Sequence, residues 1–370
     1  MKVGLNATCL NDRPSGATQR FVGIYSELFK ILPEIEFVIY ESKDCSVGAW
    51  FNDSANISVR KSPIPSEGRL RKYTKGLWYW DRALRQEHLD LFEVFNLPVV
   101  TAPSGKTFLT IHDIRFLYPE WQGAERVAYR SILRNAIKKS DHIITVSAAM
   151  KNEILKFFPE TSICIVPNGL DASLFEFISV SDLDEVRERL SLPEKFLLTV
   201  GHFENRKNYL RLISSFSLLL RMGHDISLII VGNDSGMGNL LCKKIADDHL
   251  TQKVRLLSGL SDHDVRCLYK LSTLFVFASA YEGFGIPILE AMASRCPMIL
   301  SNLPVFREIT EEQAIYFPHD DIVAIANAME IGLTSKDERR RLVHYGSRRI
   351  RDFSFEQLAK QVATIYGDLV

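Results

Sequence analysis

The sequence carries no excess of charge of either sign, because its 45 lysines and arginines balance its 45 aspartates and glutamates. Such a chain does not attract polyanions through its overall field, so any basic preference has to be local. No apolar run approaches the roughly 18–20 residues that a membrane-spanning helix needs. The N-terminal sequence MKVGLNATCL also lacks the apolar core of a secretory signal. We therefore expect neither a nucleic-acid partner nor a membrane-spanning segment.

Cysteine is present, but not in the spacing of a metal site. The six cysteines are scattered without a C-x-x-C pair, which argues against both a zinc site and a disulfide framework. The simplest interpretation is a reduced, cytoplasmic protein whose thiols are buried as small hydrophobic groups.

Three glycine-containing fingerprints are missing as well. The chain contains no G-x-G-x-x-G, no G-x-x-x-x-G-K-[ST] and no G-x-S-x-G. The first absence argues against a nicotinamide-dependent dehydrogenase. The absence of the other two motifs further reduces the number of protein classes to which the chain could belong.

What the chain does have is a regular series of short apolar runs that end in Gly, Asn, Asp or Ser. The expected strands lie within residues 2–7, 36–41, 106–113, 142–147, 163–169, 196–202, 226–233, 254–260, 274–280 and 297–302. Segments of helical period separate them, for example YLRLISSFSLLLRMG at 209–223. Runs that are apolar on both faces suit strands buried under helices, so the alternation predicts parallel βαβ units.

Two such series in succession predict an α/β protein with two doubly wound, Rossmann-like parallel-sheet domains. The polar segment 171–195 marks the break between them. We expect an N-terminal domain over 1–175, a C-terminal domain over 176–350, and a C-terminal helix over 351–370 that packs back on the N-terminal domain.

The stretch YEGFGIPILEAMASRCP follows one of the buried strands. Its glycines and proline predict a sharp turn into a helix, where the amides of Phe284, Gly285 and Ile286 would form an anion site. Glu282 and Glu290 flank that site and cannot themselves bind an anion. They are suited to accept hydrogen bonds from hydroxyl groups attached to it, as in a sugar or ribose. The alternative is an ordinary helix start with a solvated Glu290.

Two further strand ends carry candidate groups. In TVGHFENRKNYL, Arg206 and Lys207 stand where a helix dipole disfavours cations, which makes sense if a diphosphate binds between them and the amides. A solvated basic loop is the alternative. In LTIHDIRF, His112 could donate to a substrate oxygen or act as an acid or base, or it could be purely structural. Gly16 lies in a polar loop after the first strand.

Residues 60–85 form a local basic and aromatic cluster. Eight lysines and arginines there meet two acids and the sequence WYW. The cluster could contact anionic lipid headgroups or a lipid diphosphate. Its aromatic residues could equally pack a helix into the core.

With these residues identified, the chain resembles the retaining glycosyltransferases of the GT-B fold, family 4 (group 1), over essentially its whole length. Five family motifs occur in the expected order on the expected strand ends. They are H-D at His112 and Asp113, V-S at Val146 and Ser147, P-N-G-x-D at Pro167, Asn168, Gly169 and Asp171, E-x-R-K-N at Glu204, Arg206, Lys207 and Asn208, and E-x7-E at Glu282 and Glu290.

The resemblance implies two domains facing a central cleft, a nucleotide-sugar donor and no divalent metal. It assigns Arg206 and Lys207 to the donor diphosphate, Glu290 to the ribose hydroxyls and Glu282 to the transferred sugar. His112 would face that sugar from the N-terminal domain, and Gly16 would lie near the phosphates and the acceptor.

The amides from Phe284 to Ile286 would back the phosphate or the sugar. The motif variants are most similar to mannosyltransferases that use GDP-mannose, so we expect this donor before a UDP-sugar. The acceptor is expected to be a glycan or lipid-linked hydroxyl in surface polysaccharide or lipopolysaccharide synthesis, with the protein at the inner face of the membrane.

The chain departs from the family at three positions. Arg295 replaces a glycine, the loop at Gly16 has one glycine where two are usual, and His202 replaces an arginine of some relatives. Two other functions stay open: a non-catalytic nucleotide-sugar-binding subunit, and a nucleotide-sugar epimerase of the same architecture. The first would need neither His112 nor Glu282, and the second would release a free nucleotide-sugar isomer.

Overall fold

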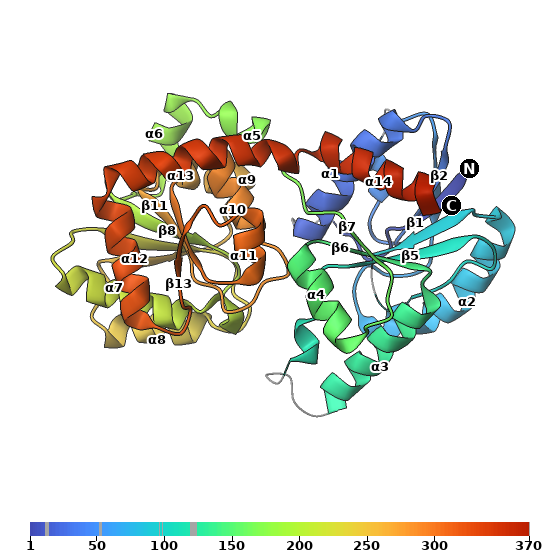
Figure 1. Ribbon diagram of the computed structural model, residues 1–370, viewed down its shortest axis with the longest axis horizontal. Helices are drawn as coiled ribbons and strands as arrows, with labels where there is room; N and C mark the ends of the chain where they lie inside the picture. Colours follow the sequence, from blue (N-terminus) through green and yellow to red (C-terminus); the bar gives the residue numbers. More distant parts are fainter. Residues whose placement is uncertain (12–14, 52–53, 96, 98, 119–123, 370) are drawn as a thin grey trace. The chain divides into compact units, whose positions relative to one another are not determined.

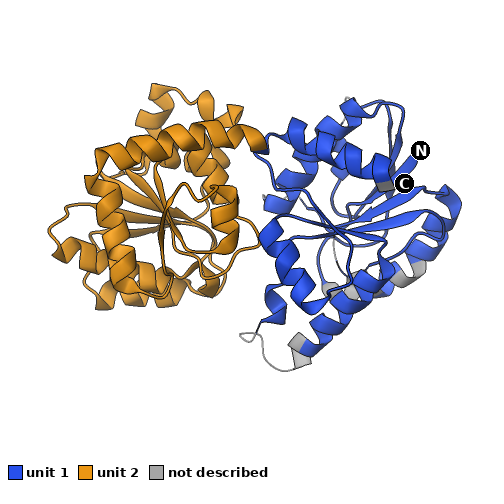
Figure 2. Ribbon diagram, viewed as in Figure 1, with its two compact units in different colours: residues 1–170, 353–370 blue, residues 171–352 orange. Residues whose placement is uncertain are grey.

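The computed structural model describes residues 1–11, 15–51, 54–95, 97, 99–118 and 124–369. The chain forms two compact units (Figure 2). Unit 1 contains residues 1–170 and 353–370, and unit 2 contains residues 171–352. The sequence places the division slightly later, after residue 175, and starts the C-terminal helix at residue 351.

Unit 1 is built on a seven-stranded sheet in the order β3-β2-β1-β4-β5-β6-β7, and each pair is parallel. The central strands are buried on both faces, which is why apolar residues predominate in them. The strands are β1 (Lys2–Asn6), β2 (Glu36–Glu41), β3 (Ile57–Lys61), β4 (Leu91–Val94), β5 (Lys106–Ile111), β6 (His142–Thr145) and β7 (Ile163–Ile165).

Helices cover both faces of this sheet (Figure 1). They are α1 (Gly16–Ile31), α2 (Arg69–Glu87), α3 (Ala124–Lys139), α4 (Ala148–Phe157) and α14 (Phe355–Leu369), with short 3-10 helices η1 (Val47–Phe51) and η2 (Arg115–Leu117). The C-terminal helix α14, red in Figure 1, lies beside the blue α1. Apolar residues of both helices join one core with strands β1 and β2.

Two of the sequence motifs serve local structure in unit 1. The hydroxyl of Ser147 caps α4 by accepting from the amide of Met150 at 3.0 Å. The carbonyl of Pro167 accepts from the guanidinium of Arg20.

Unit 2 repeats the architecture with a six-stranded parallel sheet in the order β10-β9-β8-β11-β12-β13. The strands are β8 (Phe196–Val200), β9 (Ser227–Val231), β10 (Val254–Leu257), β11 (Leu274–Phe277), β12 (Met298–Ser301) and β13 (Ile315–Phe317). A separate core fills this unit, with α7 supplying much of the apolar surface on one face.

Helices alternate with the strands of unit 2 from β8 to β13, and further helices precede β8 and follow β13. The helices of this unit are α5 (Ser173–Glu176), α6 (Val180–Arg189), η3 (Asn205–Lys207), α7 (Tyr209–Arg221), α8 (Gly238–Asp247), α9 (Asp262–Leu271), α10 (Ile286–Ala293), α11 (Pro304–Ile309), α12 (Ile322–Thr334), α13 (Lys336–Arg349) and η4 (Ile350–Phe353). The helix expected over 209–223 is therefore confirmed as α7.

Each strand expected from the sequence is present, and the prediction of two doubly wound domains is confirmed. Strands β3, β4 and β13 were not anticipated. Within the described part of the chain, no helix combines the length and the apolar character that crossing a bilayer requires.

Candidate functional site

The strand order of unit 2 reverses between β8 and β11, because the neighbours of β8 are β9 and β11. In an open parallel sheet, such a switch point leaves a crevice at the carboxyl ends of the two strands. The loop after β8 carries Arg206 and Lys207, and the loop after β11 carries Glu282. The topology thus brings residues 75 positions apart to one place.

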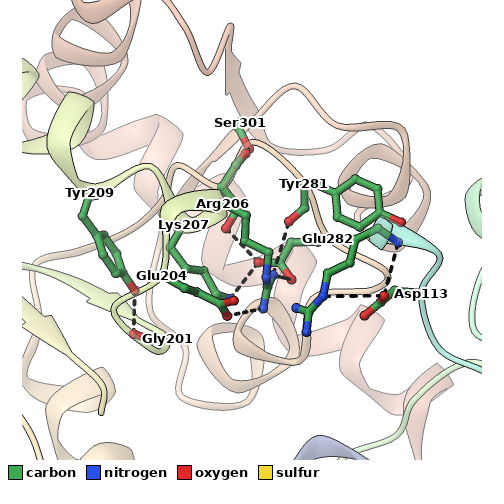
Figure 3. A network of polar contacts seen from close by, with 11 residues as sticks. Asp113, Gly201, Glu204, Arg206, Lys207, Tyr209, Tyr281, Glu282 and Ser301 are labelled. Carbon is green, nitrogen blue, oxygen red and sulfur yellow. Dashed lines mark hydrogen bonds and ion pairs between the residues drawn. The ribbon is translucent and has the colours of Figure 1, made fainter. Parts of the chain in front are cut away.

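The two loops meet in a tight cluster of charges (Figure 3). One carboxylate oxygen of Glu282 lies 2.7 Å from the Lys207 ammonium, and the other lies 2.5 Å from the Arg206 guanidinium. The hydroxyl of Ser279 donates to Glu282 at 2.8 Å. Glu204 contacts Arg206 from the opposite side at 2.7 Å. Two cations and two carboxylates of the chain therefore balance one another in charge.

Burial shapes the ionisation of this cluster. Burial alone would raise the pKa of the Glu282 carboxyl, but Lys207 and Arg206 outweigh it and hold the pKa below the usual range. Burial also lowers the pKa of Lys207, more strongly than its ion pair with Glu282 raises it. For Arg206 the neighbouring carboxylates prevail, and its pKa is raised. Glu282 and Arg206 are thus both held in their charged forms, and Lys207 is the group whose charge burial weakens.

The local backbone explains how Lys207 reaches Glu282. The lysine is 6% exposed, and its ammonium lies 4.9 Å from the ring centroid of Phe277 on β11. A Cβ atom at Gly201 would lie 2.8 Å from the Lys207 side chain, so glycine leaves the room that the lysine occupies. The hydroxyl of Tyr209 donates to the carbonyl of Gly201 at 2.8 Å and fixes the loop.

Asn208, the last residue of the E-x-R-K-N motif, has a structural role. Its φ of 61° lies in the left-handed region, which asparagine tolerates better than most residues. Its side-chain amide donates to the carbonyls of Ala278 at 3.1 Å and His319 at 2.6 Å. The motif therefore ties the β8 loop to the ends of β11 and β13.

Helix α10 begins in the same region. Gly285 precedes its first residue, Ile286, with a φ of 145° that glycine adopts readily, and a proline occupies the first turn. Phe284, Gly285 and Ile286 thus lie at a helix start, as predicted. Arg295, at the glycine position of the family, adopts a φ of 56° at the end of this helix. An arginine thus adopts the left-handed conformation at this turn.

Glu290 lies one turn into α10 and has a different environment from Glu282. One of its carboxylate oxygens accepts from the hydroxyl of Tyr269 at 2.8 Å. Burial raises the pKa of the Glu290 carboxyl, and the hydrogen bond from Tyr269 offsets part of that rise. The two glutamates of E-x7-E therefore do not share a partner: Glu282 pairs with cations and Glu290 with a phenol.

The remaining candidate residues belong to unit 1. His112 follows β5 and lines a small cavity of about 20 Å³ together with Arg20 and Glu93. Burial lowers the pKa of His112 to about 3, and the positive charge of Arg20 contributes to the shift. Gly16 is the first residue of α1, whose start is capped by the Ser15 hydroxyl 3.1 Å from the Thr18 amide.

The basic cluster at 60–85 spans β3 and α2. Trp80 is 4% exposed and packs on the rings of Tyr40 and Phe92, so this aromatic residue belongs to the core. Lys75 and Arg82 are exposed. The side chains of residues 69–73, 77 and 78 lie outside the described part of the chain.

Sequence reasoning missed three groups that complete the site. Ser279 was overlooked because a serine at a strand end is unremarkable by itself. Tyr209 and Tyr269 lie on the apolar faces of their helices, where the sequence pattern does not show whether a tyrosine hydroxyl has a role that phenylalanine could not fill. The partners of the two tyrosines lie on other elements, whereas Ser279 lies three residues before Glu282 in the same loop. No periodic pattern reports such a pairing.

Comparison with known proteins gives a consistent result. The family described as "Glycosyl transferases group 1" matches residues 182–349, and the family described as "Glycosyltransferase Family 4" matches residues 37–174. The first match contains the whole charge cluster and Glu290. The second contains His112.

Among characterised relatives, the serotype-specific mannosyltransferase WbdA of Escherichia coli is 30% identical over 283 residues, which are 72% of this chain and 34% of that protein. The O-antigen chain mannosyltransferase RfbU of Salmonella typhimurium is 33% identical over 215 residues, 58% of this chain and 57% of the relative. The chain thus spans about a third of the first relative and just over half of the second.

Solved structures share the fold. Anabaena Alr3699/HepE in complex with UDP and glucose superposes with a TM-score of 0.76 at 17% identity, covering 100% of both chains. WaaG, a glycosyltransferase involved in lipopolysaccharide biosynthesis, gives a TM-score of 0.73 at 16% identity, covering 98% of this chain and 99% of that one. Both similarities establish the GT-B architecture.

Proposed function

The chain belongs to the family 4 (group 1) glycosyltransferases, and from this membership we propose that it transfers a hexose from a nucleotide sugar to a hydroxyl of a glycan or lipid-linked acceptor. GDP-mannose is the first candidate donor, because the relatives include mannosyltransferases. A UDP-sugar is the second, since a structural neighbour was crystallised with UDP and glucose. The product would enter surface polysaccharide or lipopolysaccharide.

The observation that carries this proposal is the pairing of Arg206 and Lys207 with Glu282 at the switch point of unit 2. A nucleoside diphosphate leaves with growing negative charge, and two fixed cations in a low-dielectric crevice would stabilise it. In this role the cations take the neutralising task that a divalent ion has in other transferases, so we propose metal-independent transfer.

The other residues receive roles that follow from chemistry and from family membership. Glu290 would accept from the ribose hydroxyls, and the helix start at Phe284, Gly285 and Ile286 would face a phosphate or the sugar. Glu282 would move between its cations and the transferred hexose. His112 and Gly16 keep the roles that the resemblance gives them, toward the reacting sugar and the phosphates.

A ligand screen followed by product analysis tests the function. We expect GDP or UDP, and the matching nucleotide sugar, to raise the thermal unfolding midpoint, because a ligand that binds the native state stabilises it. With a donor and an acceptor, NMR should show a glycoside with the anomeric configuration of the donor, in the presence of EDTA. A free nucleotide-sugar isomer as the product would identify an epimerase. Binding without turnover of any acceptor would favour a non-catalytic subunit.

We also propose peripheral contact with an anionic, inner-face membrane through the cluster at 60–85. The exposed Lys75 and Arg82, rather than the buried Trp80, would meet the headgroups. Reversing both charges to glutamate should reduce co-sedimentation with phosphatidylglycerol vesicles and leave nucleotide binding unchanged. Reversal of the exposed Arg221 in unit 2 is the matched control. Equal sedimentation of all three proteins would refute the contact.

A further inference from the structure

Tyr269 makes an unusual contact for a core residue. It lies near the end of α9, it is 0% exposed, and its ring packs 5.2 Å from that of Phe275 on β11. Its hydroxyl does not end in the core, however, but donates to the Glu290 carboxylate of α10 at 2.8 Å. A phenylalanine would fill the same space, so the packing does not explain the hydroxyl.

The contact uses one carboxylate oxygen of Glu290 and leaves the other available. Oε2 accepts from Tyr269, whereas Oε1 has no partner among the described residues and is not sealed from solvent. A carboxylate held at one oxygen loses most of its rotational freedom. The remaining oxygen then presents its lone pairs in a fixed direction. Fixing a binding group in advance reduces the entropy that a ligand has to overcome.

We propose that Tyr269 is a positioning residue, which holds Glu290 so that its free oxygen accepts a ribose hydroxyl of the donor nucleotide. This inference rests on the proposed function, because it assigns Glu290 to the ribose. It adds a residue outside the E-x7-E motif to the nucleotide site. It also explains why this half-buried carboxylate accepts one hydrogen bond from the described part of the chain.

The hydrogen bond from Tyr269 also affects the protonation of Glu290. The charged groups that act on it are Asp262 and Arg266 of α9 and Lys207 of the β8 loop. Burial and Asp262 raise the pKa of its carboxyl, whereas Tyr269, Lys207 and Arg266 lower it. Without the phenol the pKa would rise further above the ordinary value of 4.5. Glu290 would then become protonated, and lose its acceptor strength, at a higher pH.

The test combines Tyr269→Phe with nucleotides that have and lack the ribose hydroxyls. We expect Tyr269→Phe to weaken binding of GDP by roughly three- to tenfold, the range of a single hydrogen bond. Binding of 2′,3′-dideoxyguanosine diphosphate should not change, because that probe has no hydroxyl for Glu290. The loss of GDP affinity on acidification should begin at a higher pH than in the parent protein. If the parent protein binds UDP instead, the UDP pair of probes replaces the GDP pair.

Two variants make the result specific. Tyr345→Phe removes another tyrosine-to-glutamate hydrogen bond of unit 2, to Glu311 at 3.1 Å, and should leave both affinities unchanged. In a Glu290→Gln background, Tyr269→Phe should cost much less than in the parent, because the group that it positions has already changed.

Each outcome has one meaning. If Tyr269→Phe weakens GDP and its dideoxy analogue equally, the phenol supports the fold and the positioning role is wrong. If it changes neither, the role is wrong as well. A parent protein that binds no nucleoside diphosphate would overturn the proposed function itself. A parent that binds GDP better than the dideoxy probe, with an unaffected variant, overturns only the role of Tyr269.

Discussion

In each unit of the molecule a carboxylate lies at the centre of a polar cluster, and the two carboxylates accept hydrogen bonds from different kinds of donor. In unit 1, Glu93 on β4 is 2% exposed and accepts from the hydroxyls of Tyr25 and Tyr366 at 2.6 Å and Thr110 at 2.9 Å. In unit 2, Glu282 accepts from the cations of Arg206 and Lys207 and from one hydroxyl.

The difference separates a structural carboxylate from a functional one. The donors of Glu93 are neutral and come from α1, β5 and α14, so the carboxylate ties the C-terminal helix to the sheet. Neutral hydroxyls offer little to another anion. Besides the hydroxyl of Ser279, the donors of Glu282 are two cations from one loop, and the Arg206 side chain is 24% exposed. Cations near solvent can transfer their attraction to an incoming phosphate.

The largest effect should come from removing the cations of unit 2. Arg206→Ala with Lys207→Ala should weaken nucleoside diphosphate binding by roughly 3–6 kcal/mol, since each charge-assisted contact contributes about 1.5–3 kcal/mol. The sequence alone predicts that diphosphate binding falls far more than thermal stability. The structure predicts a loss of stability too, because the double variant leaves Glu282 buried without a countercharge.

Adding Glu282→Gln to that double variant separates the two effects. The triple variant should regain part of the thermal stability, since the buried Glu282 carboxylate is no longer left without a countercharge, but it should not regain affinity. Calorimetric titration and thermal unfolding on both proteins measure the two quantities. Recovery of binding in the triple variant would show that the cations do not contact the diphosphate.

The next effect tests unit 1. Glu93→Leu should destabilise the protein by roughly 3 kcal/mol, because three buried hydroxyls lose their acceptor. Nucleotide affinity, measured below the unfolding transition, should stay the same. Glu282→Gln is the matched control. It should also lower stability, because Lys207 is left buried without its countercharge, but unlike Glu93→Leu it should change the ligand properties. A strong effect of Glu93→Leu on nucleotide affinity would remove the distinction between the two carboxylates.

The fold was largely predictable because buried parallel strands have a simple signature. The three strands that were missed each lack it. β3 and β13 both lie at the edge of a sheet, where β3 is mostly exposed and β13 is only partly buried. β4 carries Glu93 in its centre, and a charged residue in a short apolar run hides a buried strand. Its three hydroxyl partners come from distant segments, which the sequence does not bring together.

The site was predictable to the level of motifs but not of pairings. Residue type and strand-end position identify Arg206, Lys207, Glu282 and Glu290 as candidates. Which of them meet is decided by the strand order, since β8 and β11 are neighbours only in the folded sheet. The sequence does not predict that Glu282 and its two cations neutralise one another.

Because Glu282 is paired with cations and Glu290 with a tyrosine, the two glutamates of the E-x7-E motif should respond differently to substitution. Glu290→Gln should weaken both the nucleoside diphosphate and the complete donor by about 1–2 kcal/mol, because both carry the ribose. Glu282→Gln should keep or raise the affinity for the diphosphate, since it frees a cation, yet slow transfer strongly. An interaction that matters mainly as the sugar detaches affects rate rather than ground-state binding.

Titration calorimetry with the diphosphate, together with turnover, measures this pair of variants. Glu282→Asn, which shortens the side chain, serves as the control for lost charge with altered reach. Loss of diphosphate affinity in Glu282→Gln, with retention in Glu290→Gln, would reverse the assignment of the two carboxylates.

The smallest effect concerns His112, which lines the same small cavity of unit 1 as Glu93. With a pKa lowered to about 3, this histidine stays neutral at every pH at which the enzyme would be assayed. The pH profile of kcat/KM between pH 5.5 and 8 should therefore have the same shape in the parent and in His112→Asn, and differ only in height. Stability should respond instead. The unfolded histidine takes up a proton below its ordinary pKa of 6.5 while the folded one does not, so acidification from pH 6.5 toward 5 favours unfolding. His112→Asn removes that proton uptake, and its unfolding midpoint should fall less over the same interval. A bend near pH 6.5 that the variant abolishes would show that His112 titrates in the native protein and acts as an acid or base.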